Sequence, residues 1–371
     1  MPDRISTLLV LGASGDLAAR LLLPAVGQLL DSTEGPEGLT LIGAGSEQWD
    51  QKTWRDRVQI SFAAGKAVGL RTEEVLGRTR YLSADVTQAA DLRQLLAACD
   101  GPPAIYFALP PAVTAKACAA LAELELPTGT GLVMEKPFGV DQPSAQALNA
   151  VVGQLVPESQ IHRVDHFIGK SAVLNLLGLR FANRVFEPLW NADHIERVDI
   201  IFDEPLALEN RARYYDGAGA LVDMIQSHLL QVLALVVMDP PATLDAEDVR
   251  DRKAEALRAC KLLGDDPVSA GRRARYSAGT IDGRELPGYA DESGVDPSRQ
   301  TETWRNSSCR SATGDGPECR FCCARARRWV TVGRKSWSPS RVYRAAFQAC
   351  PATNSRRGCA CPSDPIAWLW M

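Results

Sequence analysis

Histidine is the side chain whose ordinary pKa allows proton transfer near neutral pH, and this 371-residue chain has only four. His228 lies in a polar interruption, Gln226-Ser227-His228, of a predicted helix over Gly219–Met238 that is otherwise largely apolar. A histidine buried in a helix is more often a core residue than a catalyst, so the residues alone leave its role open. The other three are His162, His166 and His194.

A glycine turn, Gly12-Ala13-Ser14-Gly15-Asp16-Leu17, follows the first apolar run and opens a predicted helix. Gly12 permits a tight turn, and Gly15 lets the backbone approach a pyrophosphate. The helix N-terminus then presents free N–H groups and a positive dipole end to the phosphate. Ala13 and Ser14 stand where GxGxxG could have its second glycine. Many α/β proteins use such a turn only for packing, but its place after an N-terminal strand favours dinucleotide binding.

Strand-like and helix-like segments alternate over residues 1–165 and would position this turn. The strand-like runs are Ser6–Leu11, Leu39–Gly43, Ala104–Leu109, Gly131–Met134 and Ile161–Val164. The helix-like stretches are Leu17–Leu30, Lys52–Phe62, Ala89–Ala98, Ala112–Leu124 and Ser144–Leu155. This alternation predicts an α/β fold with a doubly wound, parallel sheet. Ligands bind such sheets at the carboxyl ends of the strands.

Six sequence blocks in one order resemble the glucose-6-phosphate dehydrogenase family. They are GASGDLAARLLLPA (12–25), ALPP (108–111), EKPFG (135–139), RVDHFIGK (163–170), YYDGAGALVDMIQSHLLQ (214–231) and the stretch from RYSAGTIDG to TETW (275–304). The resemblance implies a Rossmann-type dinucleotide-binding domain over 1–165 and, over 166–304, part of an α+β domain with an antiparallel sheet. It also implies oxidation of glucose 6-phosphate at C1 to the lactone, with hydride passing to nicotinamide.

The resemblance assigns the general base to His228. Oxidising a sugar C1–H requires removal of the hydroxyl proton, which a base of near-neutral pKa can accept. In the family, the aspartate matching Asp165 is paired with that base, where it would orient the ring and stabilise the imidazolium. The usual asparagine beside the base is replaced here by Ser227.

The resemblance also implies the substrate contacts. His166 and Lys170 would hold the phosphate, and Lys136 of EKPFG would lie between the sugar and nicotinamide. Glu204 and Asp223 would accept sugar hydroxyls. Asp223 and His228 are five residues apart, about 140° around an α-helix, so the spacing itself does not bring them together.

A tyrosine is common in the RVDHFIGK motif, and Phe167 replaces it here. The change removes one possible donor to the substrate phosphate, so we expect somewhat weaker binding.

Cofactor choice depends on the end of the second strand. The family grips the 2′-phosphate of NADP with an arginine there, so NADP is the family default. In this chain Ser46 stands at the arginine position and Glu47 follows it. A carboxylate suits the free 2′-hydroxyl of NAD and repels a phosphate, so we expect NAD to be accepted. Alternatively, Arg55 or Arg57 compensates for the missing arginine.

Charge and cysteine content divide the chain at Trp304. Residues 305–371 carry 12 basic and 3 acidic residues, whereas residues 1–304 carry 29 and 42, within a net charge of -4. Seven of the ten cysteines also follow residue 304. We therefore place a boundary there.

Residues 305–371 match neither the family nor a repeating pattern. Arg, Cys, Ser, Trp and Pro dominate without a period of two or 3.6, so we expect this tail to be disordered. A GC-rich gene translated in the wrong frame would produce such a composition, and this is our leading explanation. Its cysteines (Cys319-x2-Cys322-Cys323 and Cys359-x-Cys361) are irregularly spaced and no histidine accompanies them, so we expect no metal site. No aromatic–basic module points to a nucleic-acid partner.

Two functional hypotheses follow, an active oxidoreductase or a catalytically dead, truncated dinucleotide-binding fragment. The family forms homo-oligomers, and we expect the interface to be lost here with the missing sheet. The same loss predicts uncovered apolar faces on helices Gly219–Met238 and Lys170–Arg180. We expect no signal peptide, because the apolar stretch Leu8–Gly12 is short, and the apolar run Leu229–Met238 is too short to span a bilayer. We therefore expect a soluble, cytoplasmic protein with no membrane partner.

Overall fold

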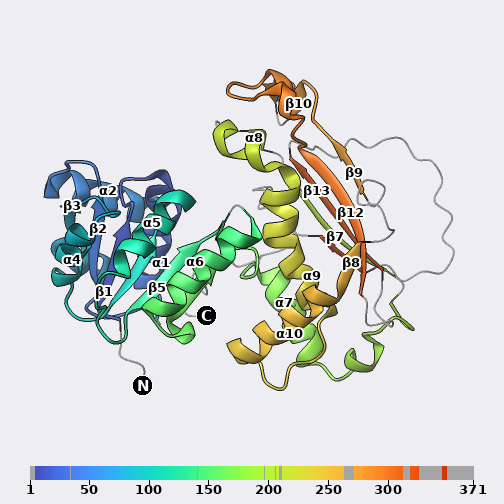
Figure 1. The fold of residues 1–371 in the computed structure, drawn as a ribbon, viewed down its shortest axis with the longest axis horizontal. Coiled ribbons are helices and arrows are strands. Elements are labelled where there is room, and N and C mark those ends of the chain that lie inside the picture. Colours follow the sequence, from blue (N-terminus) through green and yellow to red (C-terminus); the bar gives the residue numbers. More distant parts are fainter. Residues whose placement is uncertain are drawn as a thin grey trace. The chain divides into compact units, whose positions relative to one another are not determined.

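The computed structural model describes residues 5–33, 35–139, 141–195, 197–204, 206–208, 211–262, 271–281, 283–311, 318–325 and 345–348. The chain divides into two units, one ending at His166 and the other beginning at Phe167, and Figure 1 shows the elements of each.

A six-stranded parallel sheet forms the centre of the first unit. Its order is β3-β2-β1-β4-β5-β6, so the order reverses between β1 and β4, where doubly wound sheets bind their ligands. The strands are β1 (Thr7–Leu11), β2 (Thr40–Gly45), β3 (Arg80–Ser83), β4 (Pro103–Phe107), β5 (Gly131–Glu135) and β6 (Ile161–Val164). β1, β2 and β4 are buried along their whole length, as continuous apolar runs predict for a sheet covered on both faces.

Helices cover both faces of this sheet. Leu8 and Val10 of β1 join an apolar cluster with Trp54, whereas Leu9 and Leu11 join another on the opposite face. The helices are η1 (Ala18–Leu22), α1 (Leu23–Asp31), α2 (Gln51–Ala64), α3 (Leu70–Arg78), α4 (Ala89–Ala97), α5 (Pro111–Leu121), α6 (Gln142–Leu155) and η2 (Glu158–Gln160). The predicted doubly wound, Rossmann-type arrangement is confirmed.

The second unit is built on a mixed sheet of order β14-β7-β13-β12-β8, with β9 also paired to β12. Its strands are β7 (Arg197–Glu204), β8 (Cys260–Leu262), β9 (Gly271–Ala274), β12 (Trp304–Ser311), β13 (Glu318–Arg325) and β14 (Ala345–Gln348), and β10 (Gly279–Ile281) pairs with β11 (Arg284–Leu286) separately. β12 is antiparallel to β8, β9 and β13, as expected. β13 and β14 run parallel to β7, which the sequence did not predict.

A layer of helices packs on this sheet, with η4 and α9 beside the strands (Figure 1). Alternate residues of β7 (Val198, Ile200 and Phe202) are buried in one cluster with Leu229 and Val232. The expectation of uncovered faces on the helices Gly219–Met238 and Lys170–Arg180 is therefore wrong. The helices are α7 (Ser171–Phe181), η3 (Glu187–Leu189), α8 (Ala212–Ala220), η4 (Leu221–Leu229), α9 (Leu230–Val237), α10 (Ala246–Ala259), η5 (Tyr289–Asp291) and η6 (Pro297–Arg299).

Three strands lie in the segment for which we expected disorder, and for these residues that expectation is wrong. β13 pairs with β12 on one side and with β7 along all eight residues on the other. A ladder formed by backbone groups does not require alternating side chains, which is why the residue pattern did not reveal it. The remainder of the tail, with its Cys359-x-Cys361 pair, lies outside the described residues.

The helical stretch Tyr214–Val237 is long and apolar enough to cross a membrane by length and composition alone. Within its most apolar window, 61% is buried inside the protein, as in the core helix of a soluble domain.

The carboxyl end of α9 is capped by the buried Arg180 of α7 and the half-buried Trp190 of the following loop. Arg180, 6% exposed, donates to the carbonyls of Leu235 and Met238 at 2.7 Å each. Trp190 Nε1 donates to the carbonyl of Val236 at 2.7 Å. Burial lowers the pKa of Arg180 to about 10, so the guanidinium remains charged at neutral pH and complements the negative end of the helix dipole.

We predict that Arg180→Met lowers the free energy of unfolding by about 3 kcal/mol, because two buried carbonyls lose their donors. Urea unfolding followed by circular dichroism measures this loss. Arg258→Met, at an exposed position on α10, is the control and should change stability by less than about 0.5 kcal/mol. Equal effects of the two substitutions would contradict the capping role.

Candidate active site

The glycine turn between β1 and η1 is fixed by backbone hydrogen bonds. Gly12 N and Ala13 N donate to the carbonyl of Ala44 at 2.8 and 3.0 Å, and Gly15 N donates to the carbonyl of Gly12 at 3.0 Å. Gly12 has φ +83°, and a Cβ there would lie 2.4 Å from the carbonyl oxygen of Ala108. Only glycine fits this position, which brings the turn against β4 at the point where the strand order reverses.

Polar side chains surround a small space at the end of β2. A Cβ at Gly45 would lie 2.9 Å from the hydroxyl of Tyr81, 3.0 Å from Oε2 of Glu47 and 3.1 Å from Oγ of Ser14. Ser14 Oγ donates to Glu47 Oε2 at 2.5 Å, and chiefly this hydrogen bond lowers the pKa of Glu47. A carboxylate beside the glycine turn, with space kept open by Gly45, fits the ribose of a dinucleotide.

Arg57 rather than Arg55 lies at the glycine turn. Its Nη2 donates to the carbonyls of Ser14 and Gly15 at 2.7 and 2.9 Å, and its charge also lowers the pKa of Glu47. Arg55 is directed elsewhere, because its Nε donates to the carbonyl of Leu76 at 3.1 Å.

The remaining predicted cofactor residues lie at the surface around the turn. Ser46 is exposed directly after β2, and Asp16 is exposed at the start of the helix, where it pairs with Arg20 at 3.2 Å. Leu17 precedes η1 and is half-buried.

Asp223 and His228 lie in η4, which is a π-helix rather than the expected α-helix. Residues five apart in a π-helix lie on the same side of the helix, because its hydrogen bonds join residues i and i+5. The two side chains, 4% and 1% exposed, therefore share one side of the helix, which α-helical geometry would not allow. Burial and the hydrogen bond and charge of Asp223 raise the pKa of Tyr214 to about 12.

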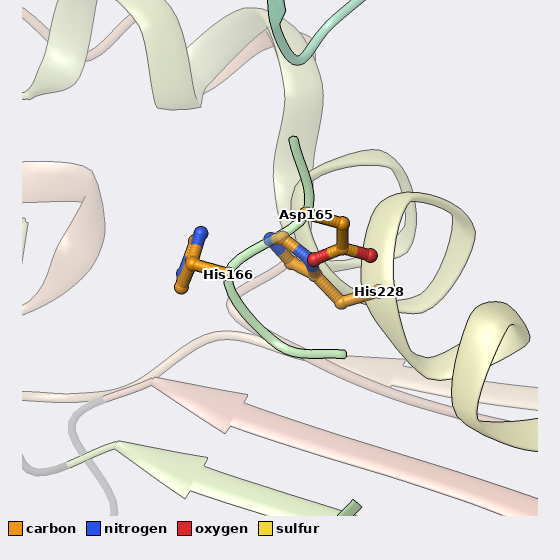
Figure 2. Close-up of side chains that lie close together, drawn as sticks. All are labelled: Asp165, His166 and His228. Atoms are coloured by element: carbon orange, nitrogen blue, oxygen red, sulfur yellow. The ribbon is translucent and has the colours of Figure 1, made fainter. Parts of the chain in front are cut away.

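The loop after β6 places an aromatic ring on the candidate base. Phe167 stacks on the His228 imidazole, with ring centroids 4.1 Å apart and planes inclined by 24°. The two residues before it, Asp165 and His166, are therefore held near the same imidazole. One donor atom of each of the three side chains lies within 4.8 Å of the others. Figure 2 shows Asp165, His166 and His228 close together. By spacing alone these three donors could also hold a metal ion, whereas the family resemblance implies none.

Lys170 joins this group through the same ring. Its Nζ lies 4.0 Å from the Phe167 ring centroid and 4.8 Å from that of Phe202, both within the range of cation–π attraction. The Lys170 ammonium group, the Phe167 ring and the His228 imidazole therefore lie in this order in one stacked column. The sequence had marked Phe167 only as a lost phosphate donor, whereas the structure stacks its ring on the candidate base.

Two predicted substrate residues lie at strand ends. Glu204 is the last residue of β7, paired with Arg325 of β13, and is half-buried. Lys136 follows β5 in the first unit, beside Glu135, whose pKa is raised by burial. The Tyr106 hydroxyl donates a hydrogen bond to Glu135.

A doubly wound, Rossmann-type unit with a glycine turn after its first strand is typical of dinucleotide-binding proteins, and the second unit adds a buried histidine and aspartate on one helix. Models of the glucose-6-phosphate dehydrogenase family match the chain, its NAD binding domain over residues 9–175 and its C-terminal domain over residues 177–312. The chain belongs to this family. The match extends past Trp304, at which we placed the boundary, and includes all of β12.

Curated relatives and solved structures agree with this assignment. The glucose-6-phosphate 1-dehydrogenase of Bacillus subtilis is 36% identical over 312 residues, covering 81% of this chain and 63% of the relative. That of Gluconobacter oxydans is 39% identical over 304 residues, covering 79% and 62%. The crystal structure of the Mycobacterium avium enzyme is 33% identical with a TM-score of 0.74, covering 86% of this chain and 70% of that one. The chain spans less than two thirds of the length of these curated relatives.

We predict that Gly12→Ala abolishes dinucleotide binding, because the added methyl group clashes with the carbonyl of Ala108 and strains φ. Gly77→Ala is the matched control, since a Cβ there meets nothing within 4 Å. Fluorescence titration with NAD and NADP measures both variants. Binding by Gly12→Ala as tight as by the control would exclude the turn as the cofactor site.

Proposed function

We propose that the chain oxidises glucose 6-phosphate at C1 to 6-phosphogluconolactone with hydride transfer to NAD(P), the first step of the oxidative pentose phosphate pathway. The observation that carries this proposal is the buried His228, stacked on Phe167 and close to Asp165. One solved structure with a TM-score of 0.76 and 27% identity is a glucose-6-phosphate dehydrogenase in complex with its substrate glucose 6-phosphate.

In this mechanism His228 accepts the proton of the C1 hydroxyl while the C1–H bond breaks and its electron pair leaves as hydride. The glycine turn would hold NAD(P), whose nicotinamide would supply the hydride acceptor. The negative charge of Asp165 stabilises the imidazolium that forms. Phe167 restricts rotation of the imidazole and keeps water from one of its faces.

The substrate is a dianion at its phosphate and carries several hydroxyls. Lys170 and the exposed His166 would contact the phosphate, and Lys136 would lie between the sugar and nicotinamide. Asp223 and Glu204 would accept sugar hydroxyls. Asp223 already accepts a hydrogen bond from Tyr214, which fixes its carboxylate for this task.

For the cofactor, we propose that NAD is accepted alongside the family default NADP. Glu47 has a lowered pKa and is therefore ionised at neutral pH, where it would bind the 2′-hydroxyl of NAD and repel a 2′-phosphate. Arg57 supports NADP as the alternative, because its guanidinium lies at the same turn.

The competing hypothesis is a catalytically dead fragment that binds dinucleotide without turning over the sugar. Cytoplasmic location, the lack of a nucleic-acid or membrane partner, and loss of the family's homo-oligomeric interface remain expectations from the sequence. Steady-state reduction of NAD and NADP by glucose 6-phosphate distinguishes an enzyme from a dead fragment.

We predict that His228→Gln lowers kcat by about 100- to 10,000-fold with little change in dinucleotide affinity, because only proton removal is lost. His194→Gln is the control, since His194 is exposed and hydrogen-bonded to Asn191. Retention of most activity by His228→Gln would show that His228 is structural.

We predict that Ser46→Arg with Glu47→Ser shifts the ratio of dissociation constants toward NADP by about tenfold. The change adds a phosphate partner and removes a repelling carboxylate. Fluorescence titration with both cofactors gives the ratio. An unchanged ratio would mean that the end of β2 does not contact the 2′ position.

A further inference from the structure

Asp223 and His228 lie on the same side of η4 because of the hydrogen-bond register of this helix. Ser227 Oγ donates to the carbonyl of Val222 at 2.7 Å, and Leu230 N donates to the carbonyl of Ile225, five residues earlier. In α-helical register the two residues would point about 140° apart. π-helical turns are uncommon and concentrate at functional sites. Because this register is uncommon, we expect contacts outside the helix to stabilise it.

The N-terminus of η4 is held by Glu302, from the TETW motif. The chain turns sharply at Gly219, with φ 66° and ψ 177°. Immediately after this turn, Ala220 N donates to the carbonyl of Glu302 at 3.1 Å, and Leu221 N donates to its carboxylate oxygen Oε1 at 3.1 Å. The first N–H groups of a helix have no partner within it. A carboxylate there is also favoured by the helix dipole.

Glu302 is itself fixed by the residues on either side of it. Thr301 Oγ1 donates to the carbonyl of Asp216 at 2.7 Å. Thr303 N donates to the carbonyl of Ala274 at 2.9 Å, and Thr303 Oγ1 accepts from Tyr276 N at 2.9 Å. The segment that carries Glu302 therefore joins the sheet at β9 to the helix at η4.

Gly219 leaves only enough space for this carboxylate. A Cβ at Gly219 would lie 3.1 Å from the carboxyl atoms of Glu302, and its φ of +66° disfavours any other residue. Gly219 and Glu302 come from two different sequence motifs, and together they cap the N-terminus of η4.

We propose that Glu302 is a positioning residue for catalysis. It anchors the first turn of η4, together with Gly219, in the register that places Asp223 and His228 on one side of the helix. Its catalytic consequence rests on the proposed function, whereas its effect on the helix does not.

Hydrogen exchange followed by mass spectrometry tests the anchoring in the full chain. Glu302→Ala should increase exchange of peptides covering residues 220–229 about fivefold, as expected for a lost helix cap. Glu302→Gln keeps an acceptor oxygen and should show a smaller increase. Glu285→Gln, at an exposed position on β11, should leave exchange unchanged, as should peptides of the first unit in every variant. Wild-type exchange in Glu302→Ala would overturn the proposal.

Kinetics test the positioning. Glu302→Ala should lower kcat and raise the KM for glucose 6-phosphate, each about tenfold, while the Kd for NAD and NADP stays unchanged. Gly219→Ala should have the same effect, and the double variant should lose no more than either single one. Increased exchange with unchanged kcat and KM would make Glu302 merely structural and would overturn the proposal. If the wild-type chain shows no turnover, the proposed function fails. The positioning of His228 is then tested by the NMR signals of its side chain. Glu302→Ala should shift these signals, and Glu285→Gln should not.

Discussion

The hydrogen-bond register of nine residues in η4 governs the geometry of the candidate active site. Asp223 and His228 are buried on one side of that helix because its backbone hydrogen bonds there join residues five apart rather than four apart. Phe167 can stack on the imidazole only if His228 points toward the loop after β6. The column formed by Lys170, Phe167 and His228, and the approach of Asp165, all follow from this one local choice.

The glycine turn depends on a different constraint, because two positions in and beside it have no space for a side chain. Gly12 and Gly45 occupy positions at which a methyl group would meet backbone or polar atoms closer than 3.0 Å. The charges around that space oppose one another, since Glu47 favours a ribose hydroxyl and Arg57 a phosphate. Arg57 already donates to two backbone carbonyls, so a 2′-phosphate would have to share it. This competition is the physical basis of the proposal that NAD is accepted alongside NADP.

Much of the first unit could be predicted from sequence because buried parallel strands are continuous apolar runs separated by helical periods. The π-helical register could not, since helix propensity and apolar periodicity do not distinguish bonds to residue i+4 from bonds to residue i+5. β12 was missed for another reason: Ser307 and Cys309 are buried on this strand, and neither residue type indicates a strand. The stacking role of Phe167 was hidden because residue type suggested only a missing hydroxyl.

In the proposed enzyme, the sheet of the second unit does more than cover the apolar faces of the helices. It also holds the segment that carries Glu302. β12 begins at Trp304, which pairs with Ala274 of β9, directly after the segment that carries Glu302. Any change that shifts β12 along β9 would move Thr303 and the Glu302 carboxylate with it, and the first turn of η4 would lose its acceptor. The family match ends at residue 312, just beyond β12. The residues that link sheet, cap and base therefore lie inside the part of the chain that the family model matches.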